Sequence, residues 1–161
     1  MRLLIASLLK PDSDQLLRQA YQQTFGHNCS IKTLHLTFIP PFTTPDPSLI
    51  RIRLTTPLHP TSFTTGSPGI FSRHRQILYL PLHPTPPLES YYRSLFPLLR
   101  PLITFESSDF PPDTIPAFLP HITLDYDFTY PLHWSLPALS VDLTQPQLLL
   151  EHQPGIWKPY V

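Results

Sequence analysis

Residues 33–38 of the chain are Thr-Leu-His-Leu-Thr-Phe, and residues 118–124 are Phe-Leu-Pro-His-Ile-Thr-Leu. Each stretch contains a His-x-Thr triplet within an alternation of polar and apolar residues. Residues two apart in a β-strand face the same side, so each stretch predicts a strand that presents a histidine and a threonine on one face. Two further His-x-Thr triplets begin at His59 and His83, but both have proline in the middle. That proline favours a turn or a strand end.

A strand and then a helix precede each of these stretches. In the first half we expect a strand over residues 3–9 and a helix that is capped by Asp12 and stopped by Gly26. In the second half we expect a strand over residues 76–82 and a helix that begins near Pro87. The order strand–helix–strand therefore occurs twice, with the two motif histidines 86 positions apart.

This duplication predicts an α+β fold with two pseudo-symmetric lobes, in which mostly antiparallel sheets flank a central cleft. We expect residues 1–161 to form one domain, with halves of about 1–70 and 71–161. The motif histidines would then lie on opposite walls of the cleft. The remaining segments are expected to be turn-rich over 55–69, loop-like over 104–119, and strands over 31–38, 49–54, 121–126, 139–143 and 147–151.

The composition indicates a small folded domain with proline-stiffened loops. The 161 residues include 23 prolines and only 4 glycines, and 41% of the residues are hydrophobic. The sequence has no collagen period, and proline interrupts helices, which argues against a coiled coil or a long helical bundle.

The charge balance and the apolar runs limit the partners. With 11 basic and 11 acidic residues, the chain lacks the basic excess of proteins that hold long nucleic acids, so we expect no extended nucleic-acid surface. No apolar run reaches the roughly 18–20 residues of a membrane span. The first apolar run resembles the start of a signal peptide, but no cleavage site follows it, and a buried strand is favoured. The single cysteine, Cys29, cannot form an internal disulfide. Together these features favour a cytoplasmic monomer.

Two His-x-Thr pairs suit the chemistry of phosphate esters. Histidine, with an ordinary pKa near 6.5, can act as a general base or a general acid. A hydroxyl two residues along can donate to a phosphoryl oxygen as charge develops there. The candidate catalytic residues are therefore His35, Thr37, His121 and Thr123, and no metal or cofactor is expected. The competing interpretation is that all four are ordinary half-buried strand residues.

The two motif stretches resemble the paired motifs of the two-histidine phosphoesterase superfamily, in its 2′-5′ RNA ligase-like and cyclic phosphodiesterase branches. The resemblance extends to the opening Arg2–Ala6 strand, to the Gly69-Ile70-Phe71 segment and to Pro120. It implies metal-independent hydrolysis of a 2′,3′-cyclic phosphate or a similar small cyclic phosphodiester, on a nucleotide or an RNA terminus. Two places differ from the RNA ligase-like branch. Tyr126 stands where a basic residue is common, and residues 39–42 replace a glycine-containing turn.

Other residues are weaker candidates for the site. Phe42 and Tyr126 follow the motifs and are candidates for stacking on a base, with core or rim packing as the alternative. Arg73 and Arg75 are candidates for a phosphate contact, with a solvated loop as the alternative. The other six histidines lack metal-ligand spacing, so a histidine-rich metal-binding protein is not favoured.

Two alternative functions use the same cleft. One is the reverse reaction, 2′-5′ ligation of RNA ends, which the neutral chain disfavours because it offers little to hold two polynucleotides. The other is a binding module for a nucleotide or an RNA end, without catalysis. Turnover of a cyclic phosphate separates the enzyme from the binding module.

Overall fold

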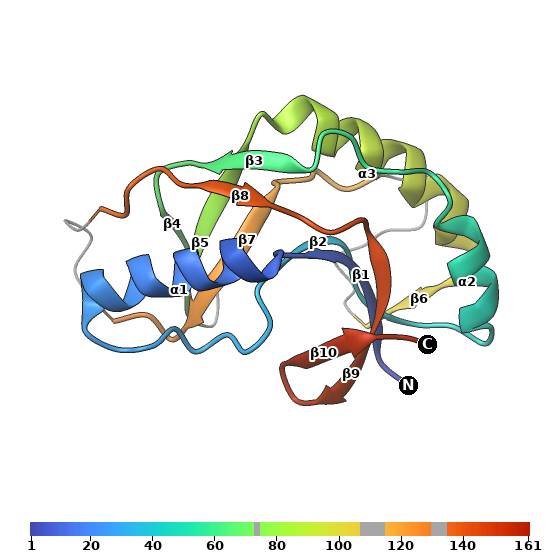
Figure 1. Cartoon of the computed structure of the whole chain (residues 1–161). Coiled ribbons are helices and arrows are strands. Elements are labelled where there is room, and N and C mark those ends of the chain that lie inside the picture. Colours follow the sequence, from blue (N-terminus) through green and yellow to red (C-terminus); the bar gives the residue numbers. More distant parts are fainter. Residues whose placement is uncertain (73–74, 107–114, 130–134) are drawn as a thin grey trace.

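The computed structural model describes residues 1–161 except 73–74, 107–114 and 130–134 (Figure 1). Arg73 therefore lies outside the described residues. Within the described part, the chain forms three α-helices, one short 3₁₀ helix and a sheet of ten strands. The helices are α1 (Pro11–Phe25), α2 (Pro47–Arg53) and α3 (Thr85–Leu99). The strands are β1 (Leu3–Leu8), β2 (His35–Thr43), β3 (Ser62–Thr65), β4 (Gly69–Ser72), β5 (Gln76–His83), β6 (Thr104–Phe105), β7 (His121–Tyr126), β8 (Ser140–Asp142), β9 (Gln147–Gln153) and β10 (Ile156–Pro159).

The sheet brings the two halves of the sequence together at its centre. Its strand order is β10-β9-β1-β2-β7-β5-β3-β8, while β4 pairs with β5 and β6 pairs with β2. Neighbouring strands are antiparallel throughout. The predicted mixed α+β class, with antiparallel pairing, is thereby confirmed. The two motif strands, β2 and β7, are direct neighbours, and the residue pair that joins them is Leu36 with Ile122.

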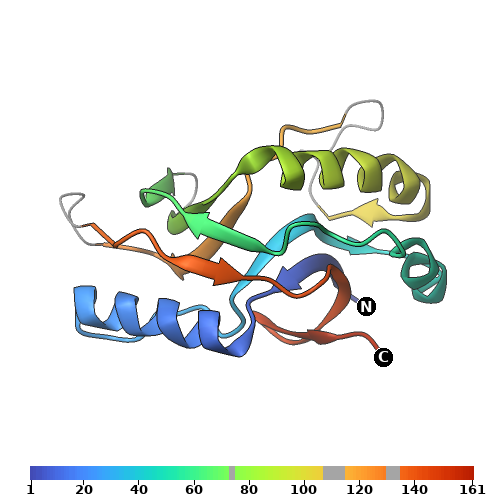
Figure 2. The ribbon, with the colours of Figure 1, turned by 45° about the horizontal axis from the view of Figure 1, so that its top comes forward.

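The helices cover the face of the sheet opposite the motif histidines. Leu17 and Tyr21 of α1 and Leu88 of α3 are fully buried, in the same core cluster as Leu36 and Ile122. In Figure 2, β3 and β8 run between α1 and α3. Because side chains alternate along a strand, burial of these two central residues turns the neighbouring histidines and threonines to the other face.

A bulge interrupts each motif strand three residues after its histidine. The β1–β2 register shifts between Ile5 and Ala6, which pair with Ile39 and Thr37 and leave Phe38 unpaired in between. The β5–β7 register shifts at the corresponding place and leaves Leu124 unpaired. A bulge inserts an extra residue, so two consecutive side chains can point inward. Phe38 and Ile39 are both buried as a result.

The predicted strand over 49–54 is wrong, because this segment is the helix α2. Asp46 accepts a hydrogen bond from the Leu49 N–H at 3.1 Å, and Pro47 occupies the first turn. A capped start of this kind outweighs the alternation of Ile and Arg that favoured a strand. Only Ile50 is buried, whereas Ile52 is 67% exposed.

Smaller differences concern element ends and short strands. The helix α1 begins at Pro11, after Lys10, so Asp12 lies inside the first turn and is not the cap. Gly26 ends the helix with a positive φ of 76°, as predicted. The segment 55–69 contains the strand β3, and the segment 104–119 begins with the strand β6. Both are short strands held by pairing rather than by their own propensity.

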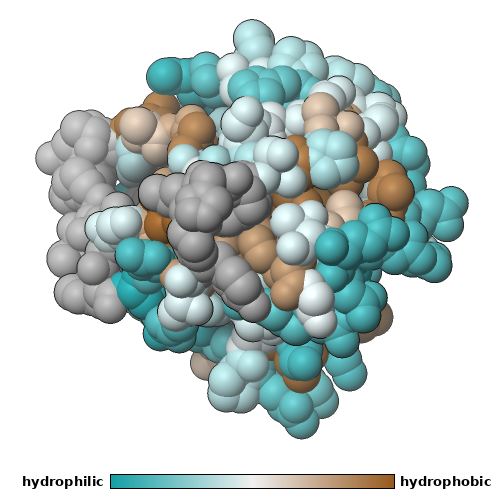
Figure 3. All heavy atoms as spheres, turned by 90° about the vertical axis from the view of Figure 1, so that its left-hand side faces the viewer, coloured by the Kyte–Doolittle hydropathy of each residue, from teal (hydrophilic) through white to brown (hydrophobic). Residues whose placement is uncertain are grey.

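The surface combines apolar and polar residues. Figure 3 shows one face on which apolar residues form patches among hydrophilic ones. Among the described residues, no helix is both long and apolar enough to cross a membrane.

Candidate functional site

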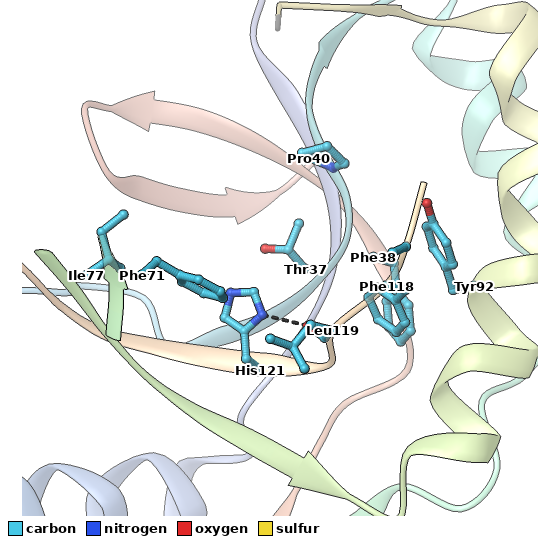
Figure 4. Close-up of a pocket in the computed structure, with 10 residues that line it drawn as sticks. Thr37, Phe38, Pro40, Phe71, Ile77, Tyr92, Phe118, Leu119 and His121 are labelled. Carbon is cyan, nitrogen blue, oxygen red and sulfur yellow. Dashed lines mark hydrogen bonds between the residues drawn. The ribbon is translucent and has the colours of Figure 1, made fainter. Parts of the chain in front are cut away.

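Each of the two motif histidines is held by a hydrogen bond of the same kind. His35 Nδ1 lies 2.7 Å from the carbonyl oxygen of Thr33, and His121 Nδ1 lies 2.6 Å from that of Leu119 (Figure 4). In each case the partner is the residue two positions earlier. A carbonyl only accepts, so Nδ1 must carry the hydrogen in the neutral ring. Nε2 of each histidine is then the unprotonated nitrogen, available to take up a proton.

The pairing of β2 with β7 places each histidine next to the threonine of the other motif. Leu36 lies opposite Ile122 in an antiparallel pair. Extending this register by one residue in each direction sets His35 opposite Thr123 and Thr37 opposite His121. Figure 4 shows the Thr37 hydroxyl on the side of the strand where the His121 ring lies. All four candidate catalytic residues therefore occupy one small area of the open face, and all are half-buried.

Burial lowers the pKa of both histidines. For His35 the loss of hydration is the main cause, the hydrogen bond to Thr33 opposes it, and the charge of His121 lowers the pKa further. For His121 the loss of hydration again lowers the pKa, and the bond to Leu119 opposes it. The electrostatic effect of His121 on His35 means that the rings lie within electrostatic range of each other. Protonation of one ring therefore disfavours protonation of the other.

A pocket of about 400 Å³ opens beside His121 (Figure 4). This volume falls within the range of small-molecule sites. Thr37 and His121 contribute polar groups to the wall of this pocket, and most of the remaining wall is apolar. The residues that line it are Thr37, Phe38, Pro40, Phe71, Ile77, Tyr92, Ala117, Phe118, Leu119 and His121. His35 and Thr123 belong to the same area of the sheet but do not line this pocket.

A pair of stacked aromatic rings supports the His121 ring. Phe71 and Tyr79 stack with ring centroids 4.0 Å apart and planes 17° apart. The Phe71 ring meets His121 edge to face at 5.0 Å. Gly69 makes this stack possible, because a Cβ at that position would overlap the Tyr79 ring. The stack and the Leu119 bond together fix the orientation of His121.

Three of the weaker candidates, Phe42, Tyr126 and Arg75, lie away from the pocket, and the fourth, Arg73, lies outside the described residues. Phe42 is fully buried in the core, where its ring cannot stack on a base. Tyr126 is 44% exposed at the other end of β7 from His121. Arg75 forms an ion pair with Asp127 at 3.7 Å and lies 5.3 Å from the centroid of the Tyr126 ring. Arg75 and Tyr126 therefore contact each other rather than the pocket.

The aromatic residues of the pocket were missed by sequence reasoning. Phe118 stands three residues before His121, and Phe71 stands in the Gly69-Ile70-Phe71 segment to which the family resemblance extends, and these placements were the available signals. Tyr92 gave no such signal, because its spacing in α3 is that of a core residue.

No group of three or more His, Cys, Asp or Glu side chains that could hold a metal ion occurs in the described part of the chain. A search with protein-family models and a comparison with curated proteins find no match to the chain.

Proposed function

We propose that the protein is a two-histidine phosphoesterase that hydrolyses a 2′,3′-cyclic phosphate or a similar small cyclic phosphodiester. The observation that carries this proposal is the matched pair of imidazoles. His35 and His121 each donate from Nδ1 to the carbonyl two residues earlier, which leaves each Nε2 free. Two identical tautomers within electrostatic range provide one base and one acid when a single proton is shared between them.

The proposed reaction is a single displacement at phosphorus. One unprotonated Nε2 takes a proton from water as the water oxygen bonds to phosphorus. The bond from phosphorus to one ester oxygen breaks, and the protonated Nε2 of the other histidine gives its proton to that oxygen. The product is a phosphate monoester. The hydroxyls of Thr37 and Thr123 donate to the non-bridging oxygens, where charge builds in the transition state.

Four features support the two-lobed, pseudo-symmetric arrangement on which this chemistry depends. The histidines, their carbonyl partners and the bulged residues Phe38 and Leu124 are all separated by the same 86 positions. Leu36 and Ile122, also 86 positions apart, oppose each other at the junction of the halves. A twofold axis that passes between β2 and β7 would exchange the two halves of the chain. It would place a residue close to the axis opposite the equivalent residue of the other half, as Leu36 is placed opposite Ile122.

The test is hydrolysis of cyclic phosphates by single variants, with EDTA present. General acid–base catalysis contributes roughly 10²–10⁴-fold, so His35→Ala or His121→Ala should each cost about 3–5 kcal/mol of transition-state stabilisation. Thr37→Ala and Thr123→Ala should cost less. His83→Ala is the matched control, since it alters a His-x-Thr triplet at the exposed end of β5 and should keep the wild-type rate.

The outcome separates the alternatives. Full activity of His35→Ala would refute the two-histidine mechanism. Binding of a cyclic nucleotide without turnover would favour a non-catalytic module, and joining of RNA ends would favour a ligase.

A further inference from the structure

The two motif histidines make the same hydrogen bond but differ in what supports their rings. Beside His121, Tyr79 stacks with Phe71, and both rings meet the imidazole edge to face. In the first half, Ala6 pairs with the motif threonine as Tyr79 pairs with the threonine of the second motif. Alanine has no ring, so His35 cannot receive the same support from that position. Another contact must orient His35 if the two rings are equally fixed.

Thr33 holds His35 with its backbone and is itself held by its side chain. Its carbonyl oxygen accepts a hydrogen bond from His35 Nδ1 at 2.7 Å. Its hydroxyl accepts from the N–H of Trp157 at 3.4 Å and donates to the carbonyl oxygen of the same residue at 3.5 Å. Both of these bonds are long and therefore weak, but together they tie the hydroxyl to one point of the backbone of β10. Thr33 lies before β2 begins, outside the ladder of the sheet, so its position depends on contacts of this kind.

The backbone of β10 is a firm anchor for this hydroxyl. Trp157 is buried in a small apolar cluster with Leu4, Ala6 and Leu149. This cluster lies on the same face of the sheet as the histidines, because Ala6 pairs with the motif threonine of β2 and paired residues share a face. β10 pairs with β9, and β9 pairs with β1 (Figure 1). The Arg2 guanidinium lies 5.6 Å from the centroid of the Trp157 ring.

The equivalent residue of the second half has no such anchor. Leu119 stands 86 positions after Thr33, and its carbonyl oxygen accepts from His121 Nδ1. The Leu119 side chain is apolar and 45% exposed, so it cannot form a hydrogen bond. The half that has the aromatic stack therefore lacks the hydroxyl, and the half that has the hydroxyl lacks the stack.

We propose that Thr33 is a positioning residue for His35, whose hydroxyl ties the carbonyl that orients this ring to the backbone of β10. The β9–β10 hairpin then orients one histidine, and the stack of Phe71 and Tyr79 orients the other. The inference rests on the proposed function, because the orientation of the ring affects catalysis only if His35 transfers a proton. The hydroxyl acts through the carbonyl and not on the substrate.

The first test observes the imidazole rings without turnover. Nitrogen-15 NMR distinguishes a neutral ring protonated at Nδ1 from one protonated at Nε2, and in the wild type both His35 and His121 should be protonated at Nδ1. Thr33→Val removes the hydroxyl and keeps the shape of the side chain. His35 should then show a mixture of the two forms, and its pKa should fall, because the bond to the Thr33 carbonyl raises it. His121 should be unchanged.

Three further variants show whether the hydroxyl is responsible. Thr33→Ser restores a hydroxyl and should restore most of the form protonated at Nδ1. Thr33→Ala removes the hydroxyl without adding an apolar branch and should act as Thr33→Val does, which covers the case in which the valine variant does not fold. Thr43→Val makes the same substitution at the exposed far end of β2 and should leave both rings as in the wild type. An unchanged His35 spectrum, an equal change in both histidines, or no rescue by serine would overturn the inference.

The second test measures hydrolysis of a cyclic phosphate. Thr33→Val should lower kcat about three- to tenfold and leave KM within about twofold, because a ring that transfers a proton is misplaced while the binding groups remain. Thr33→Ser should recover kcat. A change in KM alone, or an unchanged kcat despite the spectral change, would overturn the inference. If the wild type hydrolyses no cyclic phosphate but the His35 spectrum changes as expected, the proposed function fails, whereas the tie between Thr33 and the His35 ring stands.

Discussion

The hydrogen bond between Tyr21 of α1 and Asp125 of β7 gives the sharpest test of what holds the second motif strand in place. Tyr21 is fully buried and its hydroxyl donates to Asp125 Oδ2. Asp125 is only 8% exposed and directly follows the bulged residue Leu124. Tyr21→Phe removes the donor, keeps the ring and leaves the carboxylate buried without this partner.

The cost follows from the burial of both groups. An unsatisfied buried polar group costs about 1–3 kcal/mol, and more when it is charged, so we expect a loss of about 2 kcal/mol. For a chain of this size, 1 kcal/mol shifts Tm by about 2–4 °C. Thermal unfolding near pH 7 should therefore show Tm lower by roughly 4–8 °C.

Two comparisons make this result interpretable. Tyr126→Phe removes a hydroxyl from a residue that is 44% exposed and should change the free energy of unfolding by less than about 0.5 kcal/mol. In Asp125→Asn the charge is absent, so Tyr21→Phe should cost less in that background than in the wild type. If Tyr21→Phe shifts Tm no more than Tyr126→Phe does, the hydrogen bond does not stabilise the strand and the reasoning is refuted.

Three further predictions concern the site and its supports. Burial lowers the pKa of His35 and His121, so as the pH falls the unfolded chain binds protons before the folded protein does. The stability that the neutral rings contribute should be complete above the ordinary histidine pKa near 6.5 and decline below it, and a double variant, His35→Gln/His121→Gln, should show a smaller fall in Tm between pH 7.5 and 5.5. Gly69→Ala should displace the Tyr79 ring, cost about 1–3 kcal/mol of stability and reduce activity on cyclic phosphates. A second substitution, Tyr79→Leu, should recover the stability, and no recovery would contradict the overlap between a Cβ at position 69 and the Tyr79 ring. Asp46→Ala should cost about 1 kcal/mol in urea unfolding because α2 loses its cap, whereas Asp46→Asn should cost little, and equal losses would contradict the capping role.

The sequence was most informative where a residue pattern has one structural solution. The apolar run that became β1 and the run that became β5 could be predicted because each is short and lies between turn signals. In both motifs the histidine and the threonine are two residues apart. This spacing predicted strands with a histidine and a threonine on one face, as β2 and β7 have. The α+β class followed from these elements.

Other elements could not be predicted because long-range contacts decide them. In residues 49–54 the alternation of Ile and Arg suits a strand, but Asp46 and Pro47 begin a helix whose single buried side chain, Ile50, meets the core. The strand β3 forms because β5 and β8 lie on either side of it, and nothing within residues 62–65 signals that pairing.

The pocket shows the same limit. Phe42 follows the first motif and was a candidate for stacking on a base, with core packing as the alternative; it is buried, and the β1–β2 register shifts twice between Thr37 and Phe42. A bulge of one residue is invisible in an alternating pattern because either phase reads as a strand. The residues that surround His121 could therefore be identified only from the folded structure.

The hydrogen bonds that fix both Nδ1 atoms have a consequence for repeated turnover. With Nδ1 committed to a carbonyl in each ring, Nε2 is the one nitrogen of His35 and of His121 that can exchange a proton with a substrate. In the proposed reaction the proton that begins on one Nε2 ends on the other, so the enzyme that releases product differs from the enzyme that bound substrate. The enzyme must return to its starting protonation state by exchanging protons with solvent before the next cycle in the same direction. The protein would then exist as two isomers that differ in which histidine carries the proton. At high substrate concentration the interconversion of these isomers, rather than the displacement at phosphorus, can limit the turnover rate.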